Sequence, residues 1–203
     1  LQGEGGINAA TEKFMKGIRK LCDEEGILMI CDEVQCGMGR TGAMFAWQAY
    51  DIKPDIMSMA KAIGSGIPVG AFAMTEEVAK YSLEPGDHGT TYGGNPLACT
   101  AVSKTIEIFE KKHLVEHVQK VGAYLTKKLE ELVEEYDTVK AVKGKGLMQG
   151  IQVTKPISEI TGAALKEGLL IIGAGSDVIR FVPPLIIELE QVDEMIRILK
   201  KAL

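Results

Sequence analysis

Apolar residues in the first part of the chain recur first with the spacing of a helix and then in short continuous runs. Over residues 9–25, Phe14, Ile18 and Leu21 would share one helical face, with Asn8 as the expected N-cap and Gly26 as the end. The short apolar runs are typical of strands that are buried on both faces. The predicted strands cover residues 27–31, 56–60 and 69–74, and short helices are expected over residues 44–50 and from Thr75 onward.

The second part of the chain predicts two long helices followed by a mixture of strands and helices. Asn95 and Pro96 are typical of a helix start, and the first helix should reach about Lys111. Further helices are expected over residues 114–136, 158–167 and 190–202, and strands over residues 139–142, 147–153, 169–172 and 178–182. The change of pattern predicts two domains, residues 1–100 and 101–203.

The strand–helix–strand order at the beginning predicts an α/β fold with a parallel sheet, whose chemistry gathers at the carboxyl ends of the strands. Two of the predicted strands end at Asp32 and at Lys61. An enzyme that uses pyridoxal 5'-phosphate (PLP) needs a lysine that links to the cofactor aldehyde and an acid that keeps the pyridine nitrogen protonated. Asp32 and Lys61 could meet both needs from neighbouring strand ends. The alternative is a helix-capping acid and a surface lysine, although the small and apolar neighbours of Lys61 predict that it is enclosed.

Two other motifs suggest different chemistry. Residues 37–42 match the glycine-rich G-x-G-x-x-G pattern of dinucleotide-binding folds, but a polar stretch separates them from the preceding strand. Ser58 and Lys61 match the S-x-x-K pattern of the penicillin-binding enzymes, but the S-D-N and K-T-G motifs that accompany it are absent. We therefore interpret both matches as coincidences.

Composition narrows the class of protein. The 203 residues have a formal net charge of -5, and basic residues alternate with acidic ones, which argues against nucleic-acid binding. No apolar run reaches the length of a membrane span. The cysteines form no C-x-x-C pair and no histidines stand at metal-binding spacing, so we expect no metal and free thiols in a reducing cytoplasm. These cysteines are Cys22, Cys31, Cys36 and Cys99.

Five segments of the chain, in order, resemble the class III (ω-amino-acid) aminotransferases, a family of PLP enzymes. Residues 31–42 (CDEVQCGMGRTG) resemble the family's signature, and residues 58–66 (SMAKAIGSG) resemble its cofactor-lysine segment. Three more segments match: residues 2–6, 88–96 and 179–184. The likeness is greatest to members that act on N-acetylornithine. It implies a fold-type I PLP-dependent transferase, with residues 1–100 as the C-terminal part of the large domain and residues 101–203 as the α+β small domain.

The resemblance also implies roles for individual residues. Lys61 would be the catalytic lysine, Asp32 would pair with the pyridine nitrogen, and Gln35 would contact the cofactor's phenolic oxygen, with Glu33 and Val34 beside them. Thr91 would reach the cofactor phosphate of a partner subunit in a homodimer, and Thr90 would lie beside the substrate there. Arg180 would bind the carboxylate of glutamate or 2-oxoglutarate, and Glu4 would pair with Arg180 when no such carboxylate is bound.

The resemblance implies that the family's N-terminal half, which supplies the phosphate cup and an aromatic ring for the cofactor, lies outside these residues. We therefore expect a piece of a longer or a split enzyme, inactive by itself. The parent reaction would move an amino group from N-acetylornithine to 2-oxoglutarate in arginine synthesis. The alternatives are another ω-aminotransferase, acting on ornithine, succinylornithine or 4-aminobutyrate, and a non-catalytic fragment that only dimerises.

Overall fold

The computed structural model describes residues 1–203 as two compact units. The first, which we call the Lys61 unit, comprises Thr11–Met38 and Ala43–Leu114. The second, the Arg180 unit, comprises Leu1–Ala10, Gly39–Gly42 and Val115–Leu203. The division therefore follows Leu114 instead of residue 100, because helix α3 (Pro96–Lys111) packs against the 3-10 helix η2 (Lys61–Gly64) of the first unit. Assignment of these units to domains of a longer enzyme stays a prediction.

The Lys61 unit contains a three-stranded sheet with the order β1 (Ile30–Asp32), β2 (Ile56–Met59) and β3 (Ala71–Met74). Strands β1 and β2 are parallel, as expected, but β3 runs antiparallel to β2. The predicted parallel arrangement therefore holds for β1 and β2 and does not extend to β3. A parallel crossover needs a dozen or more residues, usually including an α-helix, whereas only η2 and a short loop separate β2 from β3.

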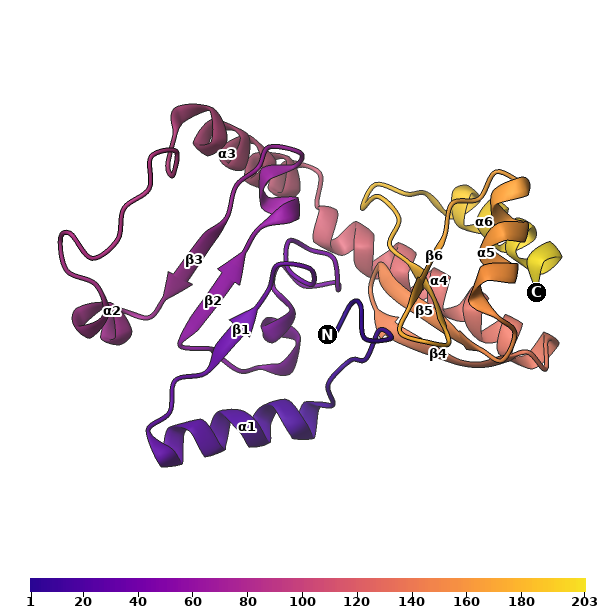
Figure 1. Ribbon diagram of the computed structural model, residues 1–203, viewed down its shortest axis with the longest axis horizontal. Helices are drawn as coiled ribbons and strands as arrows, with labels where there is room; N and C mark the ends of the chain where they lie inside the picture. Colours follow the sequence, from indigo (N-terminus) through magenta and orange to yellow (C-terminus); the bar gives the residue numbers. More distant parts are fainter. The chain divides into compact units, whose positions relative to one another are not determined.

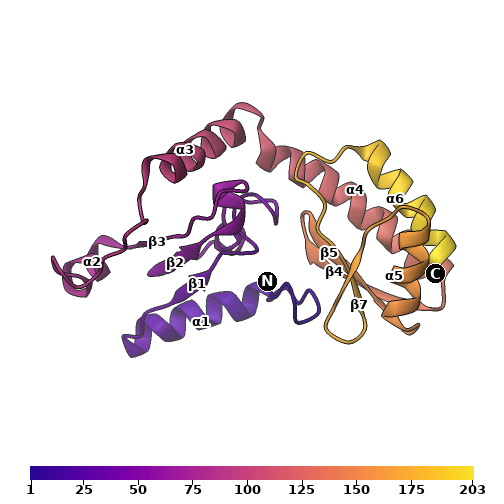
Figure 2. The same cartoon turned by 45° about the horizontal axis from the view of Figure 1, so that its top comes forward.

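Local sequence signals explain most helix ends in this unit. Helix α1 (Glu12–Glu25) is capped by Thr11, whose hydroxyl accepts from the Phe14 amide, and not by Asn8 as predicted. Gly26 ends α1 in the left-handed conformation at a φ of 65°. Residues 46–50 form a 3-10 helix, η1 (Ala46–Tyr50). Helix α2 (Glu76–Ser82) and helix α3 begin after side-chain caps from Thr75 and Asn95. Figures 1 and 2 show α1 and α3 on opposite sides of the sheet.

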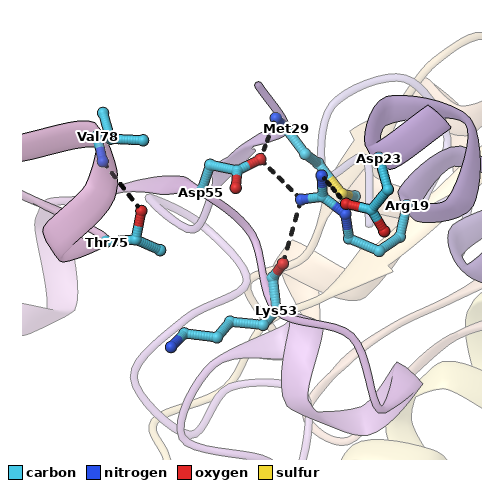
Figure 3. Close-up of polar contacts among 7 residues, drawn as sticks. All are labelled: Arg19, Asp23, Met29, Lys53, Asp55, Thr75 and Val78. Carbon is cyan, nitrogen blue, oxygen red and sulfur yellow. Dashed lines mark hydrogen bonds and ion pairs between the residues drawn. The ribbon is translucent and has the colours of Figure 1, made fainter. Parts of the chain in front are cut away.

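An ion pair fastens α1 to the amino ends of the strands (Figure 3). Arg19 donates from Nη1 to Asp55 Oδ2 at 2.7 Å and to the Lys53 carbonyl at 3.2 Å, and its Nη2 lies 2.8 Å from Asp23 Oδ1. The same Asp55 oxygen accepts from the Met29 amide at 2.7 Å. Desolvation raises the pKa of the Asp55 carboxyl, but the bonds from Met29 and Arg19 outweigh it and the net shift is downward. One carboxylate thus joins α1, β1 and β2.

The prediction that the first strand is buried on both faces was wrong. Ile30 is 64% exposed, and Ile27 and Leu28, which were expected in the strand, precede it and are also exposed. On α1, Phe14 and Leu21 are exposed as well. Continuous apolar runs are the sequence signature of a strand covered on both faces, whereas the side chain of Ile30 stays exposed among residues 1–203.

The Arg180 unit packs helices against an antiparallel sheet. The strands are β4 (Val139–Lys145), β5 (Met148–Val153), β6 (Ile172–Ala174) and β7 (Val178–Phe181), in the order β4-β5-β7-β6. The helices are α4 (Leu114–Glu135), α5 (Ile157–Lys166) and α6 (Leu189–Ala202), gathered beside the sheet in Figures 1 and 2. The apolar stripe of α4 forms the core with both other helices and the sheet: Val118, Leu125, Leu129, Leu132, Ile151, Ile160, Ile179 and Leu199. None of the helices combines the length and apolar character that crossing a membrane requires.

Candidate functional site

Asp32 and Lys61 lie at the carboxyl ends of neighbouring parallel strands. Asp32 is the last residue of β1 and pairs in register with Ser58 of β2. Lys61 begins η2 directly after β2. Asp32 Oδ1 accepts from the Val34 amide at 2.9 Å and lies 3.5 Å from the Ser58 hydroxyl, so the carboxylate is oriented by its own turn and by the neighbouring strand. The predicted placement of an acid and an amine at one sheet edge is therefore present.

Lys61 differs from expectation in its surroundings. The side chain is exposed, so the predicted enclosure was wrong for these residues. Its backbone has a φ of 48°, in the left-handed region that costs a non-glycine residue roughly 1–2 kcal/mol. Such a conformation persists where the surrounding structure imposes it, and it is found more often at functional sites than elsewhere. Here the sharp turn from β2 into η2 imposes it.

Glu33 makes contacts that the sequence did not predict. It is buried, and its two carboxylate oxygens accept from the Ala46 amide at 2.9 Å and the Trp47 amide at 3.0 Å. The side chain thereby binds the first turn of η1 and folds the segment between β1 and η1 back on itself. The two amides that donate to Glu33 lie thirteen and fourteen positions along the chain, so no local signal could have revealed this role. Contact of Glu33 with a cofactor stays a prediction.

The turn that follows Asp32 is closely packed. Val34 and Gln35 are half-buried within it. A Cβ on Gly37 would approach the Glu33 carbonyl oxygen to 2.6 Å, so this position admits only glycine. The Cys36 thiol lies 3.4 Å from a Glu33 carboxylate oxygen, and burial, together with that negative charge, raises the pKa of the thiol to about 12. Cys36 is therefore an unreactive thiol at neutral pH.

Thr90 and Thr91 lie in the exposed segment between α2 and α3. The Thr90 hydroxyl accepts from the Gly93 amide at 3.3 Å, which organises the turn locally. Both threonines belong to the Lys61 unit, together with Asp32 and Lys61. Their predicted contacts with a partner subunit stay predictions.

Arg180 and Glu4 belong to the Arg180 unit, where the N-terminal loop meets the β6–β7 hairpin. Arg180 Nη1 donates to the Gly3 carbonyl at 3.1 Å, and the Gly175 amide donates to the Glu4 carbonyl at 2.8 Å. Arg180 Nε is buried without a hydrogen-bond partner. The structure thus brings Arg180 next to the segment that contains Glu4, while a side-chain ion pair between them stays a prediction.

Arg180 also lines a mostly apolar cavity of about 490 Å³ in the Arg180 unit. Its walls come from the segment before β6, the end of β7 and helix α6, and they include Leu169, Phe181, Ile187 and Met195. An arginine can bond both oxygens of a carboxylate through its guanidinium, so Arg180 is suited to a ligand that carries a carboxylate.

The sequence is similar to known aminotransferases over its whole length. The acetylornithine aminotransferase of Methanocaldococcus jannaschii is 47% identical over 199 residues, which cover 98% of this chain and 50% of that protein. The acetylornithine aminotransferase of Caldanaerobacter subterraneus is 46% identical over 204 residues, covering 100% of this chain and 51% of that protein. The chain therefore spans about half the length of the curated relatives it matches.

Solved structures agree with this likeness. The ornithine delta-aminotransferase of Plasmodium falciparum superposes with a TM-score of 0.93 at 32% identity, covering 100% of this chain and 53% of that one. The acetylornithine aminotransferase of Elizabethkingia anophelis gives a TM-score of 0.92 at 32% identity, covering 99% and 51%. The sequence profile described as Aminotransferase class-III matches residues 1–203. Fold, ordered motifs and profile together show that the chain belongs to the class III aminotransferase family.

Proposed function

We propose that this chain supplies the lysine-bearing part of a PLP-dependent aminotransferase that moves an amino group from N-acetylornithine to 2-oxoglutarate, within arginine synthesis. The observation that supports it most is the pair Asp32 and Lys61 at neighbouring strand ends. The residues fit the cofactor, because an acid held by the Val34 amide ends one strand and a lysine follows directly after the end of the adjacent strand. The relatives named for acetylornithine favour that substrate.

The cofactor, when bound, withdraws electrons from a substrate carbon that has lost a proton. Asp32 would keep the pyridine nitrogen protonated, since a carboxylate beside it stabilises the cationic form. Gln35 would contact the phenolic oxygen. Lys61 would hold the cofactor through its amine and then take the proton from the substrate Cα, and a lysine on a short rigid turn is suited to moving a proton over a small distance.

Carboxylate recognition would fall to Arg180, whose Nε is buried and lacks a partner. Glu4 would neutralise Arg180 while the side-chain amine of the first substrate is bound. In a homodimer, Thr91 would bind the cofactor phosphate of the partner subunit and Thr90 would lie beside its substrate. We propose a cytoplasmic location, because no two of the four cysteines form a disulfide.

A chimera tests the proposal. In it, this chain replaces the matching half of the Methanocaldococcus jannaschii relative, which provides a complete length. We expect transamination with 2-oxoglutarate, fastest with N-acetylornithine among N-acetylornithine, ornithine, succinylornithine and 4-aminobutyrate, and none in the Lys61→Ala chimera. A preference for another amine would mean that this amine, and not N-acetylornithine, is the substrate; ornithine is one such candidate, given the likeness to an ornithine aminotransferase. A folded chimera without turnover would favour a non-catalytic, dimerising chain.

A further inference from the structure

The segment Gly39–Gly42 belongs to the Arg180 unit, although the residues immediately before and after it in the sequence belong to the Lys61 unit. The Leu147 amide donates to the Arg40 carbonyl at 2.9 Å, and Gln119 Nε2 of α4 donates to the Gly42 carbonyl at 2.6 Å. Main-chain and side-chain donors from the β4–β5 turn and from α4 therefore hold the segment in the Arg180 unit.

Two glycines allow the segment to approach so closely. A Cβ on Gly146 would lie 2.7 Å from the Arg40 carbonyl oxygen and 2.5 Å from the Thr41 carbonyl carbon. A Cβ on Gly122 of α4 would lie 2.7 Å from the Gly146 carbonyl oxygen. The buried Gln149 donates to the Gly122 carbonyl at 2.9 Å and so secures the stack of helix, turn and segment.

The Arg40 side chain reaches beyond this stack. Its Nη1 donates to the Leu147 carbonyl at 3.1 Å and to the Pro183 carbonyl at 2.6 Å. Burial lowers the pKa of the guanidinium to about 10, so it remains charged at neutral pH. Both acceptors are main-chain carbonyls, and a charged donor gives stronger hydrogen bonds to them than a neutral one would. Pro183 is thereby fixed by a cation from a distant part of the sequence.

Pro183 lies three positions after Arg180, just beyond the end of β7. Strands β5 and β6 hold Arg180 on either side by main-chain pairing, but the chain leaves the sheet after Phe181. Val182, Pro183 and Arg180 all line the cavity described above. The hydrogen bond from Arg40 to the Pro183 carbonyl therefore holds the chain in place just after the end of β7.

We propose that Arg40 is a positioning residue for Arg180: by holding the Pro183 carbonyl it fixes the end of β7 and the cavity wall, and so sets the affinity for the substrate carboxylate. This inference rests on the proposed function of Arg180. Arg40 acts through the main chain, because its two hydrogen bonds go to the carbonyls of Leu147 and Pro183. If Arg40 only stabilised the fold, its loss would affect both substrates equally. As a positioning residue, its loss should weaken the binding of the dicarboxylate substrate selectively.

Two measurements test the inference. Calorimetry would compare the affinity of glutarate, an unreactive dicarboxylate, for the chain and for its Arg40→Gln, Arg40→Lys and Arg197→Gln variants. Arg197 is an exposed arginine on α6 and serves as the matched control. In the chimera, kinetics would give KM for 2-oxoglutarate and KM for the amine donor for the same variants.

We expect Arg40→Gln to weaken glutarate binding roughly tenfold or more and to raise KM for 2-oxoglutarate by a similar factor, with KM for the amine donor unchanged, because only carboxylate recognition depends on the end of β7. Arg40→Lys should recover part of the affinity, and Arg197→Gln should match the wild type. If Arg40→Gln does not fold, a selective but smaller effect of Arg40→Lys decides.

Equal glutarate affinity in folded Arg40→Gln and wild type, or equal rises in both KM values, would overturn the inference. Absence of glutarate binding by the wild type would overturn it as well. A chimera without turnover whose chain still binds glutarate in an Arg40-dependent way would refute the proposed function alone.

Discussion

Removal of the Glu33 carboxylate should destabilise the Lys61 unit strongly. Glu33 is buried, and it accepts hydrogen bonds of ordinary length from the Ala46 and Trp47 amides, at 2.9 and 3.0 Å. In Glu33→Ala both amides would lose their acceptor. A buried donor left without a partner costs about 1–3 kcal/mol, so the two together should reduce the free energy of unfolding by about 2–6 kcal/mol. In Glu33→Gln one oxygen remains as acceptor, and we expect a loss of about 1–2 kcal/mol.

The assay is urea unfolding of the dilute chain followed by tryptophan fluorescence. Trp47 is the only tryptophan, and its own amide is one of the two donors, so the signal reports the affected region. Glu110→Ala, on the exposed surface of α3, is the matched control and should leave the midpoint unchanged. A midpoint for Glu33→Ala equal to that of Glu110→Ala would refute the reasoning that Glu33 holds η1 to the end of β1.

Three further outcomes are expected. Asp55→Asn should lower the free energy of unfolding by about 1–3 kcal/mol at neutral pH. Because folding lowers the Asp55 pKa, this difference in stability from wild type should persist above the unfolded pKa of about 3.9 and vanish as the pH falls through the folded pKa. A difference in stability that does not change with pH would contradict this. The chain alone should dimerise or aggregate through its exposed apolar side chains, among them Phe14 and Ile30, and light scattering that shows a monomer at all concentrations would speak against it. In the chimera, Arg180→Ala should slow the glutamate half-reaction roughly a hundredfold more than the acetylornithine half-reaction, and Glu4→Ala should favour glutamate; equal losses in both single-turnover rates for Arg180→Ala would mean that the arginine is structural.

Sequence periodicity and caps predicted the helices well, because their signals are local. The apolar stripe of α4 and the caps at Thr75 and Asn95 lie within a few residues of the helices they define. The direction of β3 was not predictable in this way, because it depends on whether the connection from β2 is long enough for a parallel crossover. The exposure of Ile30 was missed since a continuous apolar run signals a covering layer without saying which residues provide it.

In the candidate site, too, the residues that local sequence patterns mark were predictable, and the contacts between distant residues were not. Asp32 and Lys61 could be found because each ends a strand pattern in the sequence. The parallel pairing of β1 and β2 then places the two residues at the same edge of the sheet. The contacts of Glu33 and Arg40 are invisible in the sequence, since their acceptors or donors lie far along the chain: Arg40 reaches Pro183 across more than half of its length. Such long-range contacts depend on tertiary packing, and no local pattern records them.

The central claim is that Lys61 is the amine to which PLP becomes linked. Sodium borohydride fixes an aldehyde cofactor on the amine that holds it, and peptide mass mapping then identifies the residue. With the chimera and a stoichiometric amount of PLP, we expect the added mass on Lys61 and its loss from that segment in Lys61→Ala. Label on another lysine, with Lys61 unmodified in the folded wild-type chimera, would contradict the account.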